Sequence, residues 1–61
     1  MDYNHLIGVE IKSAIKDLDR ENVDYRIVSI DGKDMAITDD FLMERLNLYV
    51  VDNKITNITT G

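Results

Sequence analysis

The sequence of 61 residues contains no cysteine, so neither a disulfide nor a thiolate metal site can stabilise its core, and a reducing compartment is permitted. No stretch approaches the roughly 18 apolar residues of a membrane-spanning helix. Residues 1–5 also lack the basic segment and apolar run that begin a signal peptide. We therefore expect a soluble, cytoplasmic protein, with a secreted mature form as the alternative.

Basic residues are scarce, because seven Lys and Arg stand against twelve Asp and Glu, which gives a net charge of −5. Each basic residue is isolated, and such an acidic chain repels phosphate backbones, so we expect no nucleic-acid partner. Residues 1–61 are expected to form a single domain with a small core and little room for an enclosed active site. We therefore expect no enzyme, no metal and no cofactor.

Apolar residues recur at helical spacing between Val9 and Glu21, which predicts a helix with one buried face. Gly8 is a fair N-cap for this helix, and Asn22 can end it in a left-handed conformation. The expected buried face consists of Ile11, Ala14, Ile15 and Leu18.

Three segments after the helix have the composition of β-strands. Residues 25–30 are rich in β-forming side chains and end at a turn signal, Asp31-Gly32. Residues 45–51 alternate between apolar and other side chains, and residues 55–60 are β-branched. The last two strands should form a hairpin with either a bulge or an early end to the pairing, because the two isoleucines of the final strand are three residues apart.

Residues 31–44 then remain as a long loop between the first two strands, and loops of this length are usually functional or disordered. This loop contains two adjacent carboxylates, Asp39 and Asp40. They either have a binding role or are simply two solvated side chains. Neighbouring residues of an extended loop point apart, which disfavours a shared metal or acid–base role. The following segment, residues 41–43, either anchors the loop in the core or forms an apolar contact patch.

An ordered set of short segments resembles the potato inhibitor I family, the eglin and chymotrypsin inhibitor 2 type. The segments are LIG at 6–8, RIVSI at 26–30, TDDFLMERLNLYV at 38–50 and ITNITTG at 55–61. The Arg45-Leu46-Asn47 triplet is most similar to the bacterial branch, peptidase inhibitor family 78.

The resemblance implies an α+β fold in which a single helix packs on a small mixed three-stranded sheet. Strands one and two would be parallel, with a long exposed loop between them. In that family the loop inhibits serine proteases as a substrate mimic. The implied reactive bond joins Asp39 to Asp40, with the Asp39 side chain in the specificity pocket. The implied binding loop consists of Ile37, Thr38, Asp39, Asp40, Phe41 and Leu42.

The resemblance also implies residues that support the loop. Arg45 matches a family arginine that bonds to the side chains corresponding to Thr38 and Asp40, and Asn47 replaces a second family arginine. Asp39 stands where inhibitors of this type carry an apolar residue. The alternative is a non-inhibitory binding module, or a homo-oligomeric antagonist or small-ligand-sequestering protein, built on the same scaffold. Either way we expect a protein partner, which for an inhibitor is a serine protease.

Overall fold

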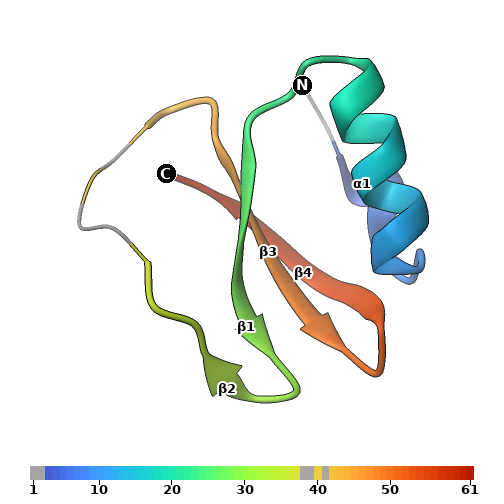
Figure 1. Ribbon diagram of the computed structural model, residues 1–61, viewed down its shortest axis with the longest axis vertical. Coiled ribbons are helices and arrows are strands. Elements are labelled where there is room, and N and C mark those ends of the chain that lie inside the picture. The colour runs from blue at the N-terminus through green and yellow to red at the C-terminus, as the bar shows by residue number, and fades with distance from the viewer. Residues whose placement is uncertain (1–2, 38–39, 41) are drawn as a thin grey trace.

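The computed structural model describes residues 3–37, 40 and 42–61, and it contains one α-helix and a mixed four-stranded sheet (Figure 1). The strand order is β2-β1-β3-β4, in which β1 and β3 are parallel and the other neighbours are antiparallel. The predicted α+β class is confirmed, but the prediction of three strands is wrong. In chain order the elements are η1 (Asn4–Leu6), α1 (Ile11–Arg20), β1 (Tyr25–Ile30), β2 (Lys33–Asp34), β3 (Leu46–Val51) and β4 (Lys54–Thr60).

Helix α1 begins two residues later than expected, and its N-cap is Glu10 rather than Gly8. The preceding residues bond to β4, where Gly8 N donates to Ile55 O at 2.7 Å and Ile55 N donates to Val9 O at 3.0 Å. These residues cannot be helical while they pair with a strand. At the other end Asn22 has the expected left-handed conformation, with φ 56°.

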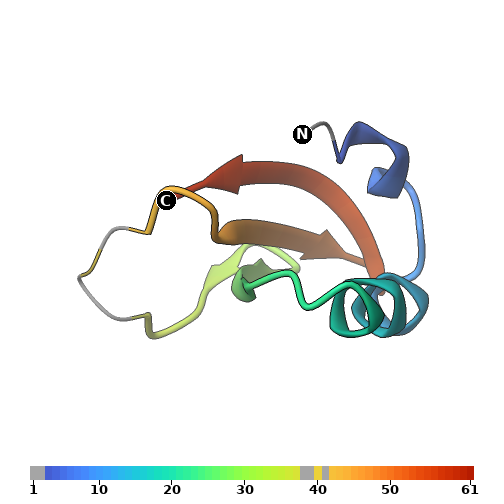
Figure 2. The ribbon, with the colours of Figure 1, turned by 90° about the horizontal axis from the view of Figure 1, so that it is seen from above.

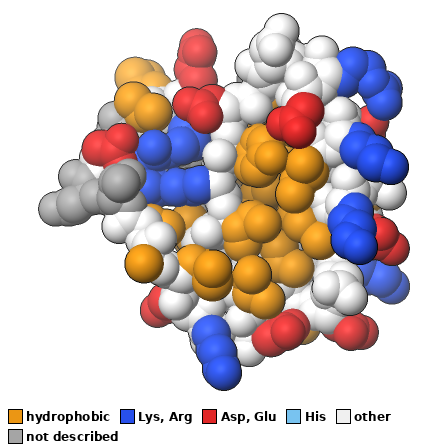
Figure 3. Space-filling model, viewed as in Figure 1, with side chains coloured by type: hydrophobic (Ala, Val, Ile, Leu, Met, Phe, Trp, Pro, Cys, Tyr) orange, Lys and Arg blue, Asp and Glu red, His pale blue; other side chains and the backbone are white. Residues whose placement is uncertain are grey.

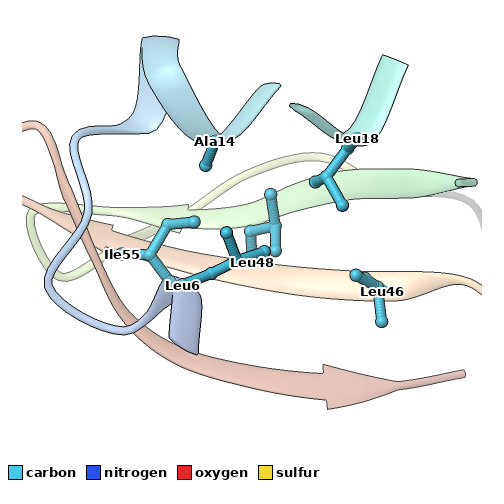
Figure 4. Packing of buried hydrophobic residues seen from close by; sticks show 6 residues of the cluster. All are labelled: Leu6, Ala14, Leu18, Leu46, Leu48 and Ile55. Carbon is cyan, nitrogen blue, oxygen red and sulfur yellow. The ribbon is translucent and has the colours of Figure 1, made fainter. Parts of the chain in front are cut away.

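The core lies between α1, η1 and one face of the sheet (Figure 4). Ala14 and Leu18 point from α1 toward the sheet, as their helical spacing predicts, and Leu46 and Leu48 meet them from β3. The six side chains of this cluster are at most 2% exposed, and burying a large apolar side chain contributes roughly 1.5–3 kcal/mol. They are Leu6, Ala14, Leu18, Leu46, Leu48 and Ile55.

The fourth strand lies in the segment that the sequence assigned to the loop. Asp31 and Gly32 have φ 51° and 81°, the two positive values that a two-residue type I′ hairpin requires. Residues 33–34 therefore fold back and pair with the end of β1, with Ile30 opposite Lys33. Of the described residues between β2 and β3, none from 35–37, 40 and 42–45 belongs to a strand.

The predicted hairpin of the last two strands is confirmed, and its turn is again two residues long, with φ 53° at Asp52 and 64° at Asn53. Of the two predicted alternatives, a bulge or an early end to the pairing, the structure has the bulge. Tyr49 pairs with Asn57 but the next residue of β3 pairs with Ile55, so Thr56 is the extra residue of β4. Strands β3 and β4 run over residues 46–51 and 54–60, one residue away from the expected starts at 45 and 55.

Candidate functional site

The loop of residues 35–44 leaves the sheet on the side away from α1 (Figures 1 and 2). Of the predicted loop residues, Ile37, Asp40 and Leu42 are described, and all three are exposed. Thr38, Asp39 and Phe41 lie outside the described residues. The described part of the loop therefore presents both apolar and acidic side chains to solvent.

Arg45 connects the loop to the sheet just before β3 begins. Its Nη2 donates to the Asp40 backbone carbonyl at 2.9 Å, and its Nη1 donates to the Asp40 carboxylate at 3.3 Å. Arg45 is only 8% exposed, and hydrogen bonds between a guanidinium and a carboxylate are stronger and more directional than neutral ones. The contact that the resemblance implies between Arg45 and Asp40 is thus present, whereas its contact to Thr38 lies outside the described residues.

A second guanidinium reaches the same place from β1, and the sequence interpretation missed it. Arg26 Nη1 lies 3.8 Å from Asp40 Oδ1, and Arg26 Nη2 donates to the Gly61 carbonyl at 3.3 Å. The alternation of β1 was a usable signal, because it places Arg26 on the face opposite Tyr25 and Ile27. The parallel register that brings Arg26 beside β3 is not visible in the sequence.

Asn47 supports the loop through Arg26. Its Oδ1 accepts from Arg26 Nε at 2.7 Å and its Nδ2 donates to Thr59 Oγ1 at 3.3 Å. Asn47 is 9% exposed, so both ends of its amide are satisfied in a buried position, as burial of an amide requires. The three side chains form a row across β1, β3 and β4, in which Arg26 pairs with Asn47 and Asn47 with Thr59.

Gly61 completes the arrangement at the end of the described chain. Its N–H donates to the Arg45 carbonyl at 3.0 Å, and its carbonyl accepts from both Arg45 Nε, at 3.2 Å, and Arg26 Nη2. Gly61 is buried as a result. Figure 3 shows basic side chains gathered beside an acidic one on the loop side of the molecule. We call Arg26, Asp40, Arg45, Asn47 and Gly61 the loop anchor.

The residues that return the loop to β3 are apolar and exposed. Leu42 is 44% exposed and Met43 is 79% exposed. Of the two alternatives for residues 41–43, these exposures favour a contact patch over anchorage in the core, although Phe41 lies outside the described residues. Met43 also lines a surface pocket of about 420 Å³ together with Tyr3 and Val23.

In comparisons with known proteins, no family model and no curated protein matches the chain. The likeness to the potato inhibitor I family therefore rests on the sequence segments quoted above. Within the described residues, no group of three His, Asp or Glu side chains is placed to hold a metal ion. None of the helices in that part of the chain has the length and apolar character needed to cross a membrane.

Proposed function

We propose that this protein is a serine protease inhibitor of the potato inhibitor I type, which presents residues 37–42 as a substrate-mimicking loop. The observation that supports this most is the attachment of Asp40 to the sheet by Arg45, through the Asp40 carbonyl and carboxylate. A loop that is ordered before it binds avoids the entropy that ordering would otherwise cost. A binding loop held from below is what a substrate mimic requires.

The proposed chemistry concerns the bond between Asp39 and Asp40. The protease serine attacks the Asp39 carbonyl, the peptide bond breaks, and the Asp40 nitrogen takes up a proton as the leaving amine. In an ordinary substrate this amine diffuses away. Here Arg45, which is itself bonded to Gly61, holds Asp40 to the sheet, so the amine stays close to the acyl-enzyme at a high effective concentration. Its return attack reforms the bond, and net cleavage is slow.

The side chain of Asp39 determines which protease the loop suits. A carboxylate that enters an apolar specificity pocket loses its hydration at a cost of several kcal/mol. A pocket with a basic side chain offsets that cost by pairing with the carboxylate. The proposed target is therefore a serine protease that cleaves after acidic residues.

Inhibition kinetics against a panel of serine proteases test this proposal. We expect saturable inhibition of proteases that cleave after Asp or Glu, and weak inhibition or none of chymotrypsin and subtilisin. Asp39→Leu should improve inhibition of the latter two by about tenfold or more, because burying a leucine contributes roughly 1.5–3 kcal/mol. Asp34→Leu, the same change at an exposed site in β2, is the matched control. A wild-type protein that inhibits no member of the panel would overturn the proposal.

A second candidate is a binding module or homo-oligomer, and the exposure of Leu42 and Met43 favours it. Burying such side chains against a partner stabilises a complex, whereas an inhibitor needs its loop free. Sedimentation velocity across a hundredfold dilution distinguishes the two functions. An oligomer that dissociates on Leu42→Asp, but not on Ile7→Asp at a comparably exposed site, would favour the module.

A further inference from the structure

We infer that Arg26 is a positioning residue of the loop, and that β1 thereby supplies a second guanidinium that fixes Asp40 relative to the sheet. The inference rests on the proposed function only in taking the loop as the binding segment of the protein. Its basis is a set of contacts that join three strands, the loop and Gly61.

The position of the Arg26 guanidinium is set by β3. Arg26 and Asn47 are register partners on adjacent parallel strands. The Nε···Oδ1 distance of 2.7 Å between them is at the short end of the range for N–H···O bonds. Asn47 is itself held by Thr59 of β4. One edge of the guanidinium is thus fixed by the sheet, and its two terminal nitrogens point to the loop and to Gly61.

The terminal nitrogens of Arg26 reach acceptors that Arg45 also uses. Asp40 Oδ1 lies 3.8 Å from Arg26 Nη1 and accepts from Arg45 Nη2 at 3.4 Å. The Gly61 carbonyl accepts from Nη2 of Arg26 and from Nε of Arg45. Two like charges around one carboxylate repel each other, so each guanidinium must be held by further contacts of its own. Asn47 does this for Arg26, and the Asp40 carbonyl does it for Arg45.

Burial distinguishes this arrangement from a surface ion pair. The side chains of Arg26 and Arg45 are 20% and 9% exposed, whereas that of Asp40 is 51% exposed. The two guanidinium groups are therefore fixed in the sheet region, and the Asp40 carboxylate attaches the loop to them. A lysine at position 26 would keep the charge, but its three N–H donors leave from one nitrogen, so it cannot reach all three acceptors that the separated Nε, Nη1 and Nη2 atoms of arginine reach.

The test is the backbone order of the loop, measured by ¹⁵N relaxation at the described positions Asp40 and Leu42. In the wild type we expect order parameters close to the value of about 0.85 for rigid backbone. In Arg26→Met and in Arg26→Lys we expect both to fall toward about 0.6. Arg20→Met, which removes the same charge from an exposed site on α1, should leave them unchanged. The amide of Leu48 in the core reports whether each variant is folded.

Three results would overturn the inference. One is unchanged order at Asp40 and Leu42 in a folded Arg26→Met protein. Another is full order in Arg26→Lys, because charge alone would then be sufficient and the forked geometry would be irrelevant. The third is a loss of the same size in Arg20→Met. If Arg26→Met does not fold, Arg26→Lys keeps the first comparison available.

The relaxation measurement involves no protease, so its result stands even if the protein inhibits none. If inhibition is found, Arg26→Met should raise the inhibition constant by about tenfold while Arg20→Met leaves it unchanged. Equal inhibition constants for wild type and Arg26→Met would overturn the role of Arg26 and leave the proposed function intact. The two proposals can therefore fail separately.

Discussion

At the scale of single residues, the loop anchor shows what a sequence can reveal and what it hides. Arg45 and Asp40 are five positions apart, and the family resemblance was enough to pair them. Arg26 and Asn47 are 21 positions apart, and their contact depends on the register of two parallel strands. Because β1 has an irregularity after Ile27, simple counting along the strands would not have fixed that register.

Tyr25 provides a prediction at the residue scale. Burial raises the pKa of Tyr25 above its ordinary value, and repulsion by the Asp19 carboxylate and a hydrogen bond to it act in the same direction. Folding therefore favours the neutral phenol. Its contribution to stability is fully present below about pH 10 and is lost as the pH rises through the raised pKa of the folded state.

We expect Tyr25→Phe to lower the free energy of unfolding by about 0.5–1 kcal/mol at neutral pH, because the bond to Asp19 is lost. Above pH 10 the difference from wild type should shrink. Urea unfolding at pH 7 and pH 11 measures both effects, with Tyr49→Phe on β3 as the control for loss of a hydroxyl. A difference that grows with pH would contradict the assignment.

At the scale of elements, local signals located most of the fold. The helical spacing of Ala14 and Leu18 and the alternation of Leu46 and Leu48 identified four of the six side chains in the core cluster. Ile11 and Ile15 of the predicted helix face are only partly buried. The Asp31-Gly32 pair marks the end of the first strand in the sequence, and a two-residue Asp-Gly turn is also a strong hairpin signal. Strand β2 was missed because its two residues, Lys33 and Asp34, are polar and exposed, so they carry no apolar pattern.

The start of α1 illustrates a different limit. Pattern reasoning placed the N-cap at Gly8, but the chain there pairs with β4 through Val9 and Ile55. Tertiary pairing of this kind overrides local preference and leaves no mark in a helical pattern. The predicted left-handed conformation of Asn22 after the helix is confirmed, because a left-handed residue that closes a helix is a local feature.

The turn between β3 and β4 supplies the prediction at this scale. Asn53 has φ 64°, where residues with a Cβ are strained and asparagine is better tolerated than most. Asn53→Ala should lower the free energy of unfolding by about 1 kcal/mol. Asn53→Gly, which has no Cβ, should remain within about 0.5 kcal/mol of wild type. Urea unfolding with an unchanged m-value checks this, and equal losses in the two variants would contradict it.

At the scale of the whole molecule, the core and the loop anchor lie on opposite faces of the sheet. Helix α1 and the buried leucines occupy one side, and the loop leaves from the other (Figure 2). Changes in the loop can therefore be made without opening the core. The sequence does not predict this division, since composition and periodicity say nothing about where a loop of polar and apolar residues folds.

The decisive property of the proposed inhibitor is how slowly its loop is cut. Mass spectrometry can follow the protein over time with a catalytic amount of a serine protease that cleaves after acidic residues. Asp34 and Glu44 are exposed near the two ends of the loop. A loop that behaves as an ordinary substrate would therefore also be cut after these two residues. We predict one slow cut between Asp39 and Asp40, followed by a constant ratio of intact to cut protein. Rapid and complete digestion at several bonds between residues 34 and 45 would contradict a substrate-mimicking loop.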